Sequence, residues 1–222
     1  MKSLNTQIFL RFGSAPLFLG LIFFLPAGTF RFWQAWVYMG ILLLPMFFAV
    51  LYFMKKDPGL LERRMRTKEK QKRQYALHAA AGLFMMAGFL LPGFDFRWGW
   101  SQVPVWVVAA AEMMVLFGYV IFLLVMRENS WLSRTVEVDR DQPVISTGPY
   151  GVVRHPMYLG VLLMFLSTPI ALGSWWGVAA MSPLPLVLVI RILTEEKVLL
   201  RELPGYEAYR KSVRFRLIPG IW

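Results

Sequence analysis

The sequence predicts an all-α protein with five to six transmembrane helices. Of its 222 residues, 57% are hydrophobic, and several apolar runs approach the roughly 20 residues that a bilayer-crossing helix requires. Helices are favoured because they satisfy their backbone hydrogen bonds within the segment. The net charge of +11 is therefore interpreted as basic loops beside anionic lipid head groups, with no nucleic-acid partner.

The apolar runs define the expected spans in chain order. Pro16 and Pro45 fall inside the first two and are candidate kink positions. The first run is interpreted as a membrane helix and not as a signal peptide, because no small-residue cleavage pattern follows it. The six runs are Ile8–Leu25, Trp33–Met54, Ala76–Leu91, Val103–Met126, Met157–Leu172 and Trp175–Ile190.

The basic residues are distributed unevenly among the connecting segments. All lysines and arginines except Arg31 and Arg97 lie in alternate segments, with the densest group in the loop Lys55–Gln74. The positive-inside rule then places both termini in the cytoplasm. The chain has no cysteine, which excludes disulfides, thiolate chemistry and Cys-based metal sites and fits a bacterial inner membrane.

The last two spans are short and are joined by a tight turn at Gly173-Ser174. About 16 residues of helix reach only about 24 Å, so we expect a helical hairpin whose ends return to the same side. The polar stretch Arg154–Tyr158 and the tail from Arg191 should then face each other, forming a cytoplasmic C-terminal pocket.

The stretch Thr147–Gly160 carries the strongest functional signal. It reads Thr-Gly-Pro-Tyr-Gly-Val-Val-Arg-His-Pro-Met-Tyr-Leu-Gly. Pro156 suits the first turn of a helix, which puts His155 and Tyr158 on one face. Helix starts favour anionic groups, so we expect a polar ligand there.

The segment before this stretch differs from the spans. Thr135–Asp139 alternates like a short extended segment, and Gln142–Tyr150 is punctuated by proline and glycine. The second of these predicts an ordered turn that offers backbone groups to a ligand.

A second polar cluster begins at Arg191. Arg191 and Glu195 are four residues apart, which allows either a pocket or a surface ion pair at a helix end. Glu112 lies inside the fourth span and is either a functional acid or a protonated or hydrogen-bonded helix-packing residue. His78 is interpreted as an interfacial capping residue. No spaced His, Asp and Glu set predicts a metal site.

Several motifs in order resemble the isoprenylcysteine carboxyl methyltransferase family, which is related to the phospholipid N-methyltransferases. They are Gly-Pro-Tyr-x-x-Val-Arg-His-Pro-x-Tyr-x-Gly, Arg-x-x-x-Glu-Glu-x-x-Leu, and Gly-Tyr-x-x-Tyr-x-x-x-Val-Arg-x-Arg-x-Ile-Pro. The resemblance covers roughly Val136–Trp222. The four spans before it match only as a hydropathy pattern.

The resemblance implies S-adenosylmethionine as methyl donor and a set of site residues. Arg191 corresponds to the residue that meets the methyl acceptor, and Arg154 and Arg191 are the candidate catalytic residues. The implied cofactor-binding residues are Gln142, Pro143, Val144, Ile145, Tyr150, His155, Pro156, Met157, Tyr158 and Glu195.

The predicted organisation is a four-helix membrane region, residues 1–126, followed by a cofactor-binding methyltransferase region, residues 127–222. The predicted function is methyl transfer to a lipophilic or lipidated acceptor of the isoprenylcysteine type. Alternatives are N- or S-methylation of a phospholipid or another small acceptor, a sterol-reductase-like enzyme using NADPH, and a non-enzymatic transporter with Glu112 as coupling site.

Overall fold

The computed structural model describes residues 4–65, 72–133, 135 and 138–222. These residues form helices joined by turns and contain no strand, which confirms the all-α prediction. The elements are α1 (Leu4–Gly13), α2 (Ala15–Ala27), α3 (Trp33–Lys56), α4 (Pro58–Met65), α5 (Lys72–Trp98), α6 (Val105–Glu128), the 3-10 turn η1 (Gly148–Gly151), α7 (Pro156–Ala171), α8 (Trp175–Met181), α9 (Leu184–Glu202) and α10 (Tyr206–Ser212).

Five helical segments within the described residues are long and apolar enough to cross a membrane, so the chain is a multi-span membrane protein. Two of them are interrupted: α1 and α2 act as one segment, as do α8 and α9. The break near Pro16 falls between α1 and α2, whereas α3 runs unbroken through Pro45. The five segments are Ile8–Ala27, Trp33–Lys56, Tyr75–Trp98, Val105–Glu128 and Trp175–Glu202.

The last hairpin has one short arm and one long arm. α7 has 16 residues, close to the expected span, and the turn at Gly173-Ser174 leads into α8 as predicted. The second arm is longer than predicted, because the helix continues past Ile190 to Glu202. Hydropathy falls at Arg191, but the residues that follow it are good helix formers.

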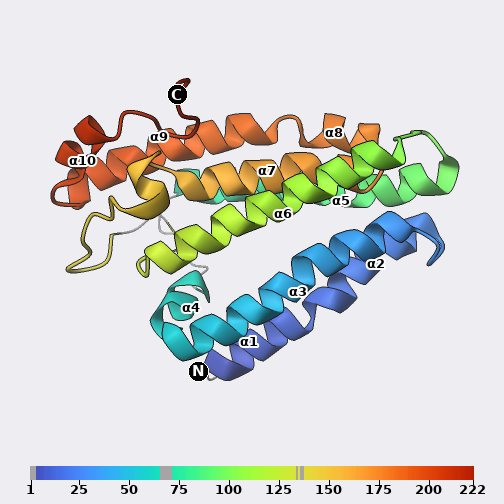
Figure 1. Ribbon diagram of the computed structural model, residues 1–222, viewed down its shortest axis with the longest axis horizontal. Coiled ribbons are helices and arrows are strands. Elements are labelled where there is room, and N and C mark those ends of the chain that lie inside the picture. Colours follow the sequence, from blue (N-terminus) through green and yellow to red (C-terminus); the bar gives the residue numbers. More distant parts are fainter. Residues whose placement is uncertain (1–3, 66–71, 134, 136–137) are drawn as a thin grey trace.

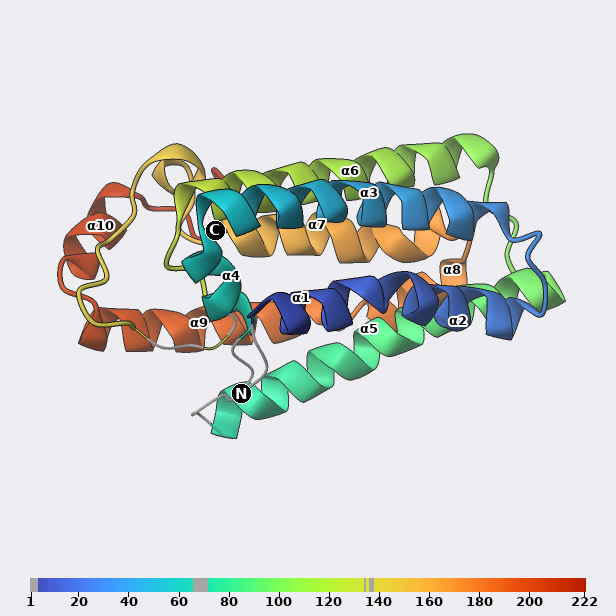
Figure 2. The same ribbon diagram turned by 90° about the horizontal axis from the view of Figure 1, so that it is seen from below.

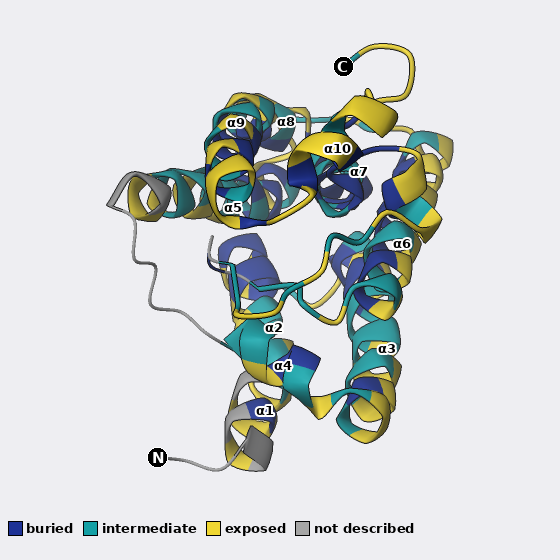
Figure 3. Cartoon of the chain, turned by 90° about the vertical axis from the view of Figure 1, so that its left-hand side faces the viewer, coloured by how far each residue is buried: buried dark blue, intermediate teal, exposed yellow. Residues whose placement is uncertain are grey.

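The long helices run side by side along one axis, and the connections gather at its two ends (Figures 1 and 2). The start of α1, α4, α10 and the loop before α7 lie at one end. The connections α2–α3, α5–α6 and α7–α8 lie at the other. Buried residues face the centre of the bundle, and exposed ones cover its outer surface (Figure 3).

The predicted basic loop Lys55–Gln74 and the predicted extended segment Thr135–Asp139 are only partly described. Residues 66–71 and 136–137 lie outside the described residues. Within the described part, Lys55 and Lys56 end α3, and Arg63 and Arg64 end α4.

The end away from α10 is held together by one buried carboxylate. Asp95, near the end of α5, is 1% exposed. It accepts hydrogen bonds from the backbone and hydroxyl of Ser101, both at 2.6 Å, and from the hydroxyl of Ser174 at 2.5 Å. Ser174 also caps α8 by accepting from the Gly177 amide. These bonds join α5, the α5–α6 loop and the α7–α8 turn.

The α6–α7 pair depends on two glycines that let the helices touch. A β-carbon on Gly118 would lie 2.7 Å from the carbonyl oxygen of Gly160. One on Gly160 would lie 2.8 Å from the carbonyl oxygen of Gly118. Small residues allow such close backbone approach between membrane helices. The contact fixes α7, which carries Tyr158, against α6.

Glu112 lies in this part of the bundle and is 4% exposed. Neither of its carboxyl oxygens has a hydrogen-bond partner among the described residues. The packing interpretation allowed a protonated or a hydrogen-bonded carboxyl group, and the described residues supply no hydrogen bond. A functional role for Glu112 stays a prediction.

We expect Gly118→Ala to destabilise the protein, because the added methyl group overlaps the backbone of α7. The loss should be about 1–3 kcal/mol in the free energy of unfolding. The measurement is thermal unfolding in detergent, followed by tryptophan fluorescence.

Gly40→Ala is the matched control, since Gly40 lies inside α3 with nothing within 4 Å of an added β-carbon. Removing a glycine from an open helix position should leave stability unchanged or raise it by up to about 1 kcal/mol. Equal melting temperatures for the two variants would contradict the close-contact account.

Candidate functional site

The site begins at the start of α7, where the sequence predicted a polar helix entrance. α7 begins at Pro156, as expected, with His155 at the position before it. The backbone amides of Arg154 and His155 donate to the carbonyls of Phe215 and Arg216, at 2.9 and 2.8 Å. The C-terminal segment therefore holds the two residues that precede the helix in place.

α9 supplies the second half of the site. The hydroxyl of Tyr158 on α7 donates to Glu195 Oε2 at 2.6 Å and accepts from Arg191 Nε at 2.7 Å. His155 Nδ1 lies 4.0 Å from Glu195 Oε1. The two polar clusters meet, as the sequence predicted, and Tyr158 joins Arg191 to Glu195.

The second glutamate of the pair lies behind this junction. Glu196 is 4% exposed. It accepts from Arg154 Nε at 2.7 Å and from Arg216 Nε at 2.9 Å. His155 Nε2 lies 3.4 Å from Glu196 Oε1 but without hydrogen-bond geometry, so we count it as an electrostatic neighbour only.

Arg154 spans this network. Besides Glu196, it donates through Nη1 to the carbonyls of Val213 and Arg214, at 2.7 and 2.8 Å. These contacts lock the C-terminal segment onto the start of α7. The catalytic role expected for Arg154 stays a prediction.

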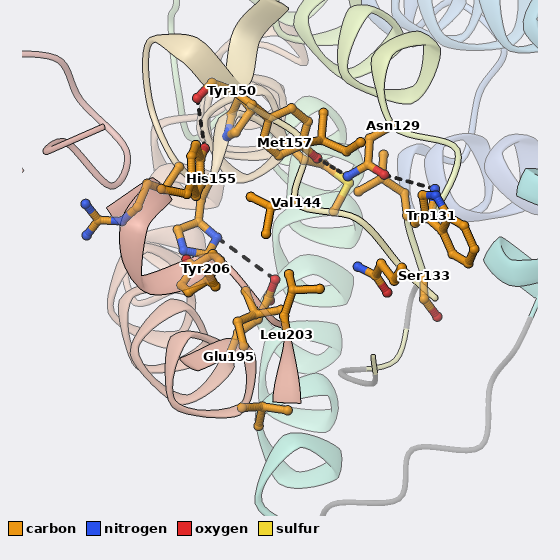
Figure 4. Close-up of a pocket in the computed structure, with 18 of the residues that line it drawn as sticks. Asn129, Trp131, Ser133, Val144, Tyr150, His155, Met157, Glu195, Leu203 and Tyr206 are labelled. Atoms are coloured by element: carbon orange, nitrogen blue, oxygen red, sulfur yellow. Dashed lines mark hydrogen bonds and ion pairs between the residues drawn. The ribbon is translucent and has the colours of Figure 1, made fainter. Parts of the chain in front are cut away.

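A cavity lies over the junction of α7 and α9 (Figure 4). It encloses about 880 Å³ of space, part of which is open to the surroundings. Every site residue predicted from the sequence lines it. The predicted lining residues are Gln142, Pro143, Val144, Ile145, Tyr150, Arg154, His155, Pro156, Met157, Tyr158, Arg191 and Glu195.

The sequence analysis missed the other side of the cavity. These residues come from the loop after α6, from the end of α9 and from α10. The sequence offered one signal for any of them, the Gly-Tyr-x-x-Tyr part of the C-terminal motif, which contains Tyr206 and Tyr209. They are Asn129, Trp131, Leu132, Ser133, Thr135, Val198, Leu199, Leu203, Tyr206 and Tyr209.

Besides Tyr158, three of the residues that line the cavity are tyrosines with buried side chains. Tyr150 accepts from Asn129 Nδ2 at 3.0 Å, and the Tyr209 hydroxyl donates to the Tyr150 carbonyl at 2.8 Å. Burial raises the pKa of Tyr209 to about 12 and raises the pKa values of Tyr150 and Tyr206 further, so all three remain protonated. The Tyr206 hydroxyl has no partner within the described part of the chain.

The helix α4 contacts the site from the N-terminal half of the chain. Arg63 donates to Asp139 Oδ2 at 3.2 Å and to the Ser130 carbonyl at 2.9 Å, and it lies over the Trp131 ring. Arg64 Nη1 is 3.6 Å from the sulfur of Met157. α4 thus anchors the loop that forms one wall of the cavity.

His78 on α5 also reaches the site. Its ring nitrogens Nε2 and Nδ1 lie 2.8 and 3.2 Å from Arg191 Nη1. The interfacial capping interpretation did not anticipate this contact. The residues that the structure describes include no group of three or more side chains able to hold a metal ion.

The fold and the cavity define a multi-span membrane protein with a cavity, lined by both polar and apolar side chains, at one end of its helices. Residues 106–205 match the family model described as phospholipid methyltransferase. That family of membrane methyltransferases is related to the isoprenylcysteine methyltransferases, so the match confirms the resemblance over this part of the chain. A comparison with curated protein sequences found no significant match.

Glu196→Gln should destabilise the protein, because it leaves the buried Arg154 guanidinium without a counter-charge. Breaking a buried ion pair costs about 3–5 kcal/mol, which should lower the melting temperature by roughly 6–20 °C. Thermal unfolding in one detergent measures the change.

Glu202→Gln is the control, since that carboxylate is exposed at the end of the same helix and, among the described residues, pairs only with its exposed neighbour Arg201. It should melt with the wild type. If both variants melt together with the wild type, Glu196 does not hold the C-terminal segment to α7.

Proposed function

We propose that the chain is an S-adenosylmethionine-dependent methyltransferase acting on the carboxylate of a lipophilic acceptor, similar to an isoprenylcysteine carboxyl methyltransferase. The observation that carries the proposal is the cavity in which the α7 start and the α9 acid meet through Tyr158. All residues lining it lie between 129 and 209. This supports a cofactor-binding region within 127–222 and a membrane region within 1–126.

The groups lining the cavity suit this cofactor. The Tyr206 hydroxyl is buried without a partner among the described residues, so it can bond to a ligand. Glu195 offers a carboxylate for an ammonium or ribose hydroxyls. Val144, Leu199 and Leu203 offer an apolar surface for a purine ring. When bound, S-adenosylmethionine supplies an electrophilic methyl group on a sulfonium.

Arg191 supports a carboxylate acceptor. It is 9% exposed, lines the cavity and carries a planar guanidinium that matches a carboxylate. A carboxylate is already ionised near neutral pH, so its methylation requires no general base. The contribution of the protein is then to hold the acceptor oxygen in line with the methyl group.

The arrangement of charges supports a cytoplasmic site. The basic ends of α3 and α4 lie at the same end of the bundle as α10 and the loop before α7 (Figure 1). Under the positive-inside rule this end faces the cytoplasm, where S-adenosylmethionine is made. A lipophilic acceptor would enter from the adjoining leaflet.

Phospholipid head-group methylation is a second candidate, favoured by the description of the matching family. An amine acceptor requires a base to remove its proton, and His155 is the nearest candidate beside Glu195. The buried cation of Arg191 favours an anionic acceptor, which is why we rank carboxyl methylation first.

Purified protein in nanodiscs should bind S-adenosylmethionine in a calorimetric titration. Glu195→Gln should weaken binding at least about tenfold, because it removes the anionic acceptor of charge-assisted hydrogen bonds. Tyr158→Phe should weaken binding less, since it loses only the group that orients Glu195. The exposed Glu202→Gln should bind as the wild type does. No binding by the wild type in several detergents and nanodiscs would remove the proposal.

Methyl transfer from a labelled donor to a host lipid extract identifies the acceptor chemistry. We expect a product whose label is lost in mild base, because a carboxyl methyl ester hydrolyses there. Arg191→Ala should reduce turnover at least about tenfold and leave cofactor affinity within about twofold. A label that is stable to base would favour the phospholipid amine instead.

A further inference from the structure

The contact between His78 and Arg191 joins two parts of the chain that no motif connects. His78 lies on α5, outside residues 106–205 of the family match and outside the predicted cofactor-binding region. Its Nε2 is nevertheless 2.8 Å from Arg191 Nη1. α5 and α9 are packed against each other, so this contact lies in the interface between them.

Only one of the two groups in this contact can donate the hydrogen bond. A guanidinium carries only hydrogen-bond donors, so the imidazole nitrogen that it meets must accept and must carry no proton. The same guanidinium donates through Nε to the Tyr158 hydroxyl at 2.7 Å. Arg191 is therefore held by α5 at one nitrogen and by α7 at another.

Two supports of this kind determine where the plane of the guanidinium lies. The Arg191 side chain has several rotatable bonds, and a single hydrogen bond would leave the plane able to turn about it. Contacts at both Nε and Nη1 remove that freedom. A planar donor fork is useful for binding a carboxylate only when its orientation is set.

We infer that His78 is a positioning residue for methyl transfer: it orients the Arg191 guanidinium toward the acceptor. The inference rests on the proposed function. His78 does not line the cavity, so it acts through Arg191 and leaves cofactor binding to the residues of α7 and α9.

The test uses farnesylated N-acetylcysteine as acceptor probe and full-length protein in nanodiscs. His78→Phe keeps a planar ring but removes the acceptor nitrogen. We expect kcat/KM for the probe to fall roughly 10–100-fold, the scale of a misplaced catalytic contact. Calorimetric affinity for the probe should also fall, while affinity for S-adenosylmethionine should stay within about twofold.

Two further variants separate positioning from general structural damage. His78→Gln offers an amide oxygen as acceptor and should recover kcat/KM to within about fivefold of the wild type. Leu83→Ala changes an exposed residue of the same helix and should behave as the wild type. A folding defect in His78→Phe would instead lower cofactor affinity and melting temperature together.

A double variant tests whether His78 acts through Arg191. In the Arg191→Ala background, His78→Phe should have no further effect, because the group that it orients is gone. Multiplied losses in the double variant, or wild-type kinetics in His78→Phe, would overturn the inference. Failure of the proposed function is distinguishable, since the wild type would then neither bind the cofactor nor methylate the probe.

Discussion

The Tyr158 hydroxyl is the point on which the site depends. It donates to Glu195 and accepts from Arg191, so one oxygen sets the relative position of an acid and a cation on α9. Tyr158 can do this because the glycine contact between α6 and α7 fixes the helix that carries it. The helix α7 thus links the packing of the membrane spans to the arrangement of the site.

The remaining ion pairs hold that junction in place from behind. Glu196 sits between Arg154 and Arg216 and joins α9 to the α7 entrance and to the C-terminal segment. A buried carboxylate with two guanidinium partners is stable only when all three remain together. The two adjacent glutamates therefore have different roles. Glu195 lines the cavity, and Glu196 holds together the residues behind it.

Much of this could be predicted from the sequence, and the misses have physical causes. Pro156 marked the start of α7 because its ring favours a first helical turn, and the hairpin brought the two clusters together. The end of α9 was missed because hydropathy reports lipid contact and not helix length. Tyr206 was missed as a site residue because the motif that contains it does not show how α10 folds back over the cavity. The His78 contact joins residues 113 positions apart, and only the packed bundle shows it.

The buried Asp95 cluster has a consequence for how the molecule can move. Its hydrogen bonds tie α5 to the α7–α8 turn at the end of the bundle away from the cavity. Helices that are joined at one end keep their spacing there and have more freedom to separate at the other end. The contact between His78 and Arg191 lies toward that other end, beside the cavity. An opening of the α5–α9 interface beside the cavity would therefore leave the Asp95 hydrogen bonds intact.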